Sequence, residues 1–151
     1  MDPKKEVSSL ELSRELRDLG HPQNDGGWYW EVTWKDGKEL VSIEWSRTKP
    51  IPIPYKEVIK APTVRELGEG IPMVVVKGEN YYHLEYDRVG GVHILSYERS
   101  VCDVGESCLD RRVDTLVKVT ADTEANVRAK MRIWLIKNKE VLGKGTHDKF
   151  M

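Results

Sequence analysis

Apolar residues return at helical spacing in residues 120–140, the longest such pattern in the chain. Thr120, Asp122 or Thr123 can cap the first turn, and Gly143 lies just beyond the last turn as a stop signal. The pattern predicts an amphipathic helix whose wide apolar face needs a sheet to cover it. The residues of that face are Val127, Met131, Trp134, Leu135 and Ile136.

A shorter helix is predicted near the N-terminal end, from Ser8 or Ser9 to Gly20. Three leucines in this segment lie at positions i, i+4 and i+7 and form its apolar stripe. The charged residues 1–7 before it are expected to be flexible. Residues 21–27 contain a proline and paired glycines, which predict a loop.

Apolar and polar residues alternate from Trp28 to Trp34, which is the period of a strand with one buried face. Asp36 and Gly37 form a favoured two-residue turn, and the alternation resumes as far as Trp45. The pattern predicts a hairpin. We expect its four tryptophans to enter the same core as the C-terminal helix. The alternative is that one or two of them are exposed and stack on a base or a peptide.

The alternating prolines in residues 47–62 exclude a central strand and a helix, and they predict an extended surface connector. A ligand of the PxxP type is the alternative for this segment. Thr63 and Glu66 match a capping box, which predicts a short helix ended by Gly68 and Gly70.

Three further strands, at residues 73–77, 81–88 and 92–99, are predicted to form an antiparallel meander. A turn at Gly90 and Gly91 would pair two positions of particular interest, His83 with Glu98 and His93 with Arg88. The two histidines would then lie on the order of 16 Å apart along the ribbon, at about 3.3 Å per residue. A long polar connection follows, ending in a short strand at residues 115–119 before the C-terminal helix.

Together these elements predict an α+β fold with a single domain at residues 8–142, followed by a flexible tail at residues 143–151. In it, an antiparallel β-sheet of two hairpin or meander units packs against an N-terminal and a longer C-terminal helix. A chain of 151 residues is long enough to bury one core without a metal or a disulfide.

The charge and hydropathy of the chain exclude some classes of partner. The 24 basic and 25 acidic residues leave a formal charge of −1, so no overall field recruits nucleic acid or an anionic membrane. No apolar run approaches the roughly 20 residues of a membrane span, and the first residues lack the apolar core of a signal peptide. We therefore expect a cytoplasmic protein with no membrane partner.

Motifs of catalytic or metal-binding chemistry are missing from the sequence, which has no phosphate-binding glycine loop, nucleophile elbow or HExxH pair. Cys102 and Cys108 are too few to form a zinc site and are expected to be free thiols. The predicted separation of His83 and His93 prevents them from sharing a metal or a proton. We expect no metal and no cofactor.

Basic residues beside aromatic ones provide a candidate ligand site. Arg47 and Lys49 follow Trp45, and another basic pair lies in the long polar connection. If the fold gathers these residues around an exposed ring, they could grip a phosphate while the ring stacks on a base. The alternative is a solvated charged surface. The candidate residues are Tyr29, Trp45, Arg47, Lys49, Arg111 and Arg112.

Three segments carry a resemblance to a known group of proteins. They are KEVSSLELSRELRDLGHPQ followed by WYW, the central APTVRELGEGIP, and DTEANVRAKMRIWLIKN near the end. Together they resemble a family of small proteins encoded by bacteriophages and prophages. The resemblance implies phage origin and action in the cytoplasm of an infected bacterium. Its motifs are structural, so it implies no reaction and assigns no active residues.

The leading functional hypothesis is a non-enzymatic phage accessory protein that binds a host protein or sequesters a host signalling nucleotide. A second hypothesis is an enzyme that cleaves a nucleotide or nucleic acid with His83 or His93. A third is direct binding of DNA or RNA, which the near-neutral charge does not favour. A homo-oligomer is compatible with the content of Trp, Tyr and Met, which are enriched at interfaces.

Overall fold

The structure is a computed structural model that describes residues 2–23, 26–51, 53–102 and 112–143. The centre of the long polar connection, at residues 103–111, lies outside the described residues, as do the predicted tail residues 144–151. The expectation of a free thiol at Cys108 therefore falls outside them as well, whereas Cys102 is exposed.

Four α-helices and one turn of 3-10 helix are described. They are α1 (Pro3–Glu6), α2 (Leu10–Asp18), α3 (Val64–Glu69), α4 (Glu124–Lys137) and η1 (Lys139–Val141). The Ser9 hydroxyl caps α2, and the Thr123 hydroxyl caps α4. The capping box predicted for Thr63 and Glu66 is present at the start of α3. None of the described helices combines the length and the apolar character needed to cross a membrane.

The strands form two antiparallel sheets. The first, in the order β2-β1-β3, contains β1 (Gly27–Lys35), β2 (Lys38–Ser46) and β3 (Lys56–Lys60). The second, in the order β4-β5-β6-β7, contains β4 (Val74–Lys77), β5 (Asn80–Val89), β6 (Val92–Val101) and β7 (Arg112–Ala121). The predicted register of the β5–β6 hairpin is confirmed, because His83 pairs with Glu98 and Arg88 with His93.

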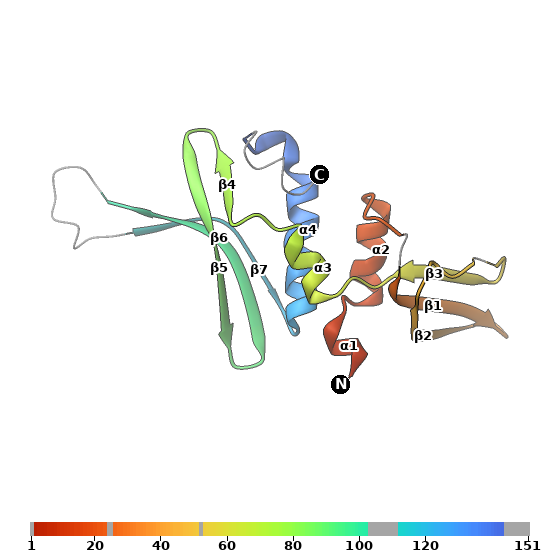
Figure 1. The fold of residues 1–151 in the computed structure, drawn as a ribbon. Coiled ribbons are helices and arrows are strands. Elements are labelled where there is room, and N and C mark those ends of the chain that lie inside the picture. Colours follow the sequence, from red (N-terminus) through yellow and green to blue (C-terminus); the bar gives the residue numbers. More distant parts are fainter. Residues whose placement is uncertain (1, 24–25, 52, 103–111, 144–151) are drawn as a thin grey trace.

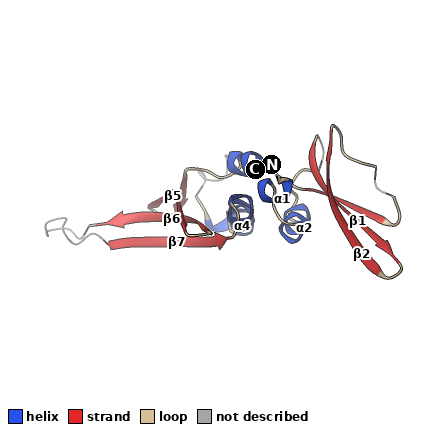
Figure 2. Ribbon diagram, turned by 90° about the horizontal axis from the view of Figure 1, so that it is seen from below, coloured by secondary structure: helices blue, strands red, loops and turns tan. Residues whose placement is uncertain are grey.

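The predicted α+β class is confirmed, and the helices form a layer between the two sheets (Figure 1). Seen from below, the four-stranded sheet lies on one side of α4, and α2 lies between α4 and the three-stranded sheet (Figure 2). Contacts of α4 with β6 and β7, and of α2 with both α4 and β3, agree with this order of layers.

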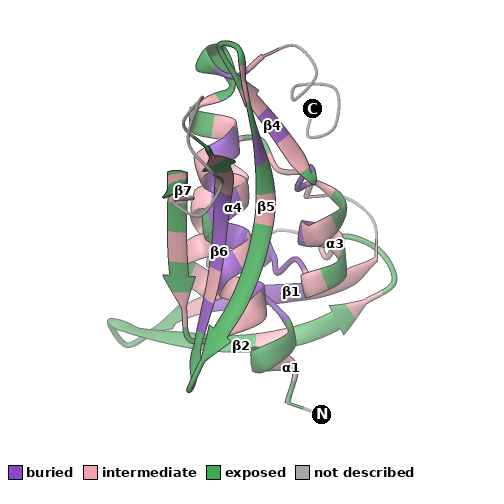
Figure 3. Cartoon of the chain, turned by 90° about the vertical axis from the view of Figure 1, so that its left-hand side faces the viewer, coloured by how far each residue is buried: buried purple, intermediate pink, exposed green. Residues whose placement is uncertain are grey.

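Helix α4 is buried on two sides, which is more than the single apolar face that the sequence predicted. Val127, Met131 and Leu135 pack into the core of the four-stranded sheet. Ala129 and Ile133 enter a second cluster, with residues of α2 and α3. The small side chain at position 129 allows the helices to approach closely. Figure 3 shows α4 as a largely buried helix behind the strands of this sheet.

The expectation that the tryptophan hairpin and the C-terminal helix share one core is wrong. Trp30 is buried, but its cluster consists of residues from the N-terminal segment and the three-stranded sheet, without α4. Trp34 and Trp45 are 51% and 57% exposed. The reason is geometric: α2 and α3 already occupy the second side of α4, so the hairpin packs on the segment before α2 instead.

Three further expectations need correction. Residues 1–7 were expected to be flexible, but Pro3–Glu6 form α1 and Val7 is fully buried, where it forms a β-bridge with Thr63. The proline-rich connector was expected to run extended along the surface, but its last third forms β3, which pairs with β1. The alternating prolines precede this strand and so leave its hydrogen bonds intact. Strand β7 is also longer than the predicted residues 115–119.

We predict that Leu16→Ala lowers the free energy of unfolding by about 2–5 kcal/mol, because Leu16 is fully buried where α2 meets α3 and α4. Leu40→Ala is the matched control, because Leu40 is 53% exposed on β2, and its effect should stay within about 0.5 kcal/mol. Urea unfolding followed by circular dichroism measures both values. Equal effects of the two substitutions would contradict the packing described here.

Candidate functional site

Strand β2 is one edge of the three-stranded sheet and β3 is the other, and among the described residues β2 pairs with β1 alone. Directly opposed residues of a sheet share a face. Trp45 and Val41 are opposite Trp28 and Val32, so they lie on the face that carries the Trp30 cluster. They are nevertheless 57% and 44% exposed. The core of this sheet thus continues onto β2 as uncovered apolar surface.

The cover over this face comes from the chain before α2 and stops short of β2. The Trp30 indole donates a hydrogen bond to the Ser8 carbonyl oxygen at 2.9 Å, which fixes this segment over β1. Ser8 N–H in turn donates to the Pro62 carbonyl at 3.0 Å, and Leu10 packs against the same cluster. The segment therefore covers β1 and the end of β3, and Figure 3 shows β2 exposed along most of its length.

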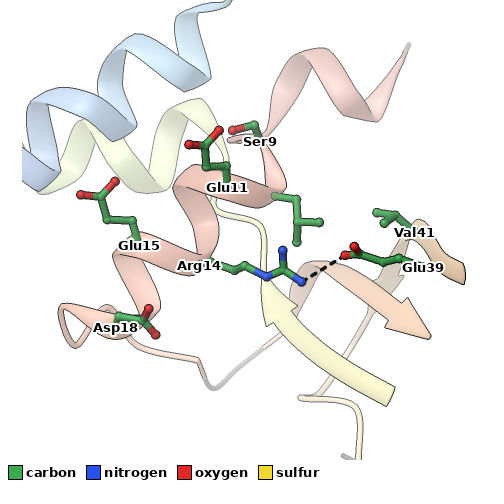
Figure 4. Close-up of a pocket in the computed structure, with 8 residues that line it drawn as sticks. Ser9, Glu11, Arg14, Glu15, Asp18, Glu39 and Val41 are labelled. Carbon is green, nitrogen blue, oxygen red and sulfur yellow. Dashed lines mark hydrogen bonds and ion pairs between the residues drawn. The ribbon is translucent and has the colours of Figure 1, made fainter. Parts of the chain in front are cut away.

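A groove of about 720 Å³ lies between α2 and the exposed face of β2 (Figure 4). Leu10 from the helix and Val41 from the strand supply its apolar part. Four carboxylates against one guanidinium give the lining a formal charge of −3. The residues that line it are Ser9, Leu10, Glu11, Arg14, Glu15, Asp18, Glu39 and Val41.

Arg14 is held by carboxylates on both neighbouring strands. Its guanidinium contacts Glu57 of β3 at 2.8 Å and Glu39 of β2 at 3.3 Å, and Arg17 contacts Glu57 at 3.0 Å. Burial opposes the ionisation of Glu57, but the hydrogen bonds from the two arginines outweigh it and lower its pKa. The hydrogen bond with Glu57 likewise raises the pKa of Arg14. These ion pairs fasten α2 to the sheet and set the width of the groove.

The remaining carboxylates form the rim of the groove along α2. Glu15 contacts Lys137 of α4 at 2.6 Å, and Asp18 contacts Arg17 at 3.1 Å. Figure 4 shows the side chains of Glu11, Glu15 and Asp18 along this helix, with Arg14 and Glu39 joined across the groove. The arrangement combines an apolar strand edge with an acidic helix.

A second, smaller cleft of about 410 Å³ lies where α2 ends against α4. The chain leaves α2 through Gly20, whose φ of +94° suits glycine, and His21 N–H donates to the Leu16 carbonyl at 2.9 Å. Gln23 then ties the loop to β3 by accepting a hydrogen bond from Lys60 N–H at 2.9 Å. The lining residues are Leu19, Gly20, His21, Pro22, Arg132, Ile136 and Lys139.

His21 is held neutral in this cleft. Burial, with added repulsion from Arg132 and Lys60, lowers its pKa from 6.5 to about 4. Its buried Nδ1 atom has no hydrogen-bond partner among the described residues. Burial also lowers the pKa of Arg132, whose guanidinium donates to the Gly70 carbonyl.

The structure brings together only some of the candidate residues from the sequence. Trp45, Arg47 and Lys49 follow one another at the end of β2 and are all exposed. Tyr29 is fully buried, and its hydroxyl donates to the Gln23 carbonyl at 3.4 Å, so its ring offers no stacking surface. Arg112 begins β7 in the other sheet, on the far side of the helical layer (Figures 1 and 2).

Arg111 lies outside the described residues. A single phosphate grip formed by Arg112 and the basic residues after β2 is therefore not assembled. The two strand histidines are also kept apart by the β5–β6 register, and His93 Nδ1 makes a 2.8 Å hydrogen bond with the Tyr86 hydroxyl. Among the described residues, no three His, Cys, Asp or Glu side chains are grouped to hold a metal ion.

The sequence patterns did not identify the residues that line the groove beside β2 or the cleft at the end of α2. Arg14, Glu39 and Val41 come from two separate segments and match no motif. His21 lies in the predicted loop and Arg132 in the predicted C-terminal helix, and no motif indicated that the two would meet. The one available signal was the apolar content of the returning strand of the hairpin, which was attributed to the core.

No protein-family model, curated protein or solved structure matched this chain. The evidence on its function lies in the geometry, the charges and the exposed apolar residues of the site.

We predict that His21 makes the protein lose stability as the pH falls from 6.5 to 4. The folded state holds its imidazole neutral, whereas the unfolded state takes up a proton near pH 6.5, so acid favours unfolding in this window. The loss is on the order of 1–3 kcal/mol, because His21 is only partly buried and solvent screens part of the effect. Urea unfolding of the wild type and of His21→Gln at pH 7.5 and 4.5 isolates this contribution as the difference between their pH dependences. Equal losses of stability in the wild type and in His21→Gln between pH 7.5 and 4.5 would contradict this prediction.

Proposed function

We propose that this protein is a non-enzymatic accessory protein of phage origin that acts by binding a protein of the bacterial host through β2 and the adjoining groove. The observation that carries the proposal is the uncovered apolar edge: Trp34, Val41 and Trp45 are each more than 40% exposed around a single edge strand. Contiguous exposed apolar surface of this kind is typical of interaction sites.

The geometry of β2 supports docking by an extended segment of the partner. An edge strand offers unpaired N–H and C=O groups, and a partner segment can extend the sheet by hydrogen bonding to them. Its alternate side chains would then reach the groove beside Val41 and Leu10. Burial of Trp45 and Val41 would provide affinity, because aromatic residues dominate the energetics of interfaces.

The charge of the groove indicates which kind of partner segment it would bind. Its lining has a formal charge of −3, which the neighbouring Lys137 and Arg17 reduce but do not cancel, so it favours a partner that alternates apolar and basic residues. Glu11, which is exposed on the outer side of α2, is well placed to attract such a segment. The same acidic lining disfavours the phosphate backbone of DNA or RNA at this groove.

We predict that the double variant Val41→Lys, Trp45→Ser loses the host partner. Affinity capture with tagged protein from bacterial lysate, followed by calorimetry with the identified partner, should show at least about tenfold weaker binding, or roughly 1.4 kcal/mol. Val113→Lys is the matched control, since Val113 is 58% exposed on the edge strand β7 of the other sheet. It should bind as the wild type does.

Two results would overturn the proposal. One is a partner that the double variant retains or that both variants lose equally. The other is a wild-type dimer in light scattering that Val41→Lys, Trp45→Ser converts to a monomer, because β2 would then serve self-association. Glu11→Lys provides an independent check, since it should slow association and reduce the salt dependence of the association rate.

A further inference from the structure

The cleft at the end of α2 differs from the β2 groove in the sign of its charge. Of its described lining residues, Arg132 and Lys139 are cationic, His21 is an imidazole, and none is acidic. Lys60 adds a third positive charge close enough to His21 to lower its pKa. The potential in this cleft therefore favours an anion.

Partial burial strengthens that preference. Desolvation lowers the pKa of Arg132, and charges in such a site are screened less by water and salt than at the surface. Gly70 makes room for the guanidinium, because a Cβ atom at this position would collide with it. The fold thus holds a charged group at the cleft despite the cost of burial, an arrangement that is frequent at binding sites.

The imidazole of His21 is held in place with an unused polar atom. Gln23 anchors the loop to β3, and the Tyr29 hydroxyl donates to the Gln23 carbonyl. The buried Nδ1 of His21 has no hydrogen-bond partner among the described residues. Such an atom costs about 1–3 kcal/mol, a cost that the fold bears to keep the imidazole at the cleft.

The size and the walls of the cleft narrow the class of ligand. Its volume of about 410 Å³ falls within the roughly 300–1,000 Å³ typical of small-molecule sites. Leu19, Pro22 and Ile136 give it an apolar wall. The two lining cations match a phosphate monoester, which carries about −1.5 to −2 at pH 7, better than a single carboxylate.

We propose that this cleft binds a small organic phosphate, with the phosphate group between Arg132, Lys139 and His21 and the organic part against the apolar wall. The cleft shares no lining residue with the β2 groove. The proposal is therefore independent of partner docking, and the two sites can be tested separately.

Isothermal titration calorimetry at pH 7 with adenosine 5′-monophosphate as the probe tests the proposal, with adenosine and inorganic phosphate as separate arms. The monophosphate should bind more tightly than either. Lys139→Gln should weaken its binding roughly fivefold, the effect of one partly exposed ion pair. Lys35→Gln is the matched control, since this exposed lysine at the end of β1 lies outside the cleft.

A second readout follows His21 directly by NMR at pH 6. A bound dianion offsets the positive charge of Arg132 and Lys60, so the imidazole signals should move toward those of the protonated form as the monophosphate is added. His21→Gln removes these signals and assigns them.

Three results would overturn the proposal. The monophosphate could bind no more tightly than adenosine, or no more tightly than inorganic phosphate, which would exclude an organic phosphate ligand. Lys139→Gln, shown to be folded by circular dichroism, could bind the monophosphate as Lys35→Gln does. The His21 signals could stay unchanged at saturating ligand. None of these results bears on the β2 groove.

Discussion

The burial of α4 on two sides is the constraint on which the rest of the structure depends. One side of this helix forms the core of the four-stranded sheet, and the other receives α2 and α3 through Ala129 and Ile133. Because both sides are occupied, the three-stranded sheet cannot pack on α4. It packs instead on α2 and on the segment before α2. These elements cover β1 but do not reach β2, which stays exposed.

The elements could be predicted from the sequence because their signals are local. The capping box at Thr63, the turn at Gly90 and Gly91 and the spacing of residues 120–140 each depend on a few neighbouring residues. The arrangement of these elements could not be predicted in the same way. Alternation in the hairpin shows which face of β1 is apolar. Which element covers that face depends on tertiary packing, which the local pattern does not specify. Val7 illustrates the limit, because a single apolar residue in a charged segment became fully buried.

The candidate sites were less accessible to prediction than the fold. The β2 groove joins the outer face of α2 to a strand edge, and neither of its parts carries a motif. The cleft at His21 depends on the pairing of a loop with a helix position more than 100 residues away. Three residues have clear structural roles in this region: Gly20 ends α2, Gln23 anchors the loop and Gly70 admits Arg132.

The separation of the hydrophobic clusters bears on how this protein can change over time. Trp30, Val32 and Ile59 hold the small sheet together, while the exposed side chains of β2 contribute little to that packing. Substitutions at Val41 or Trp45 can therefore accumulate at small cost to folding. Selection can therefore alter this surface while the scaffold beneath it stays the same.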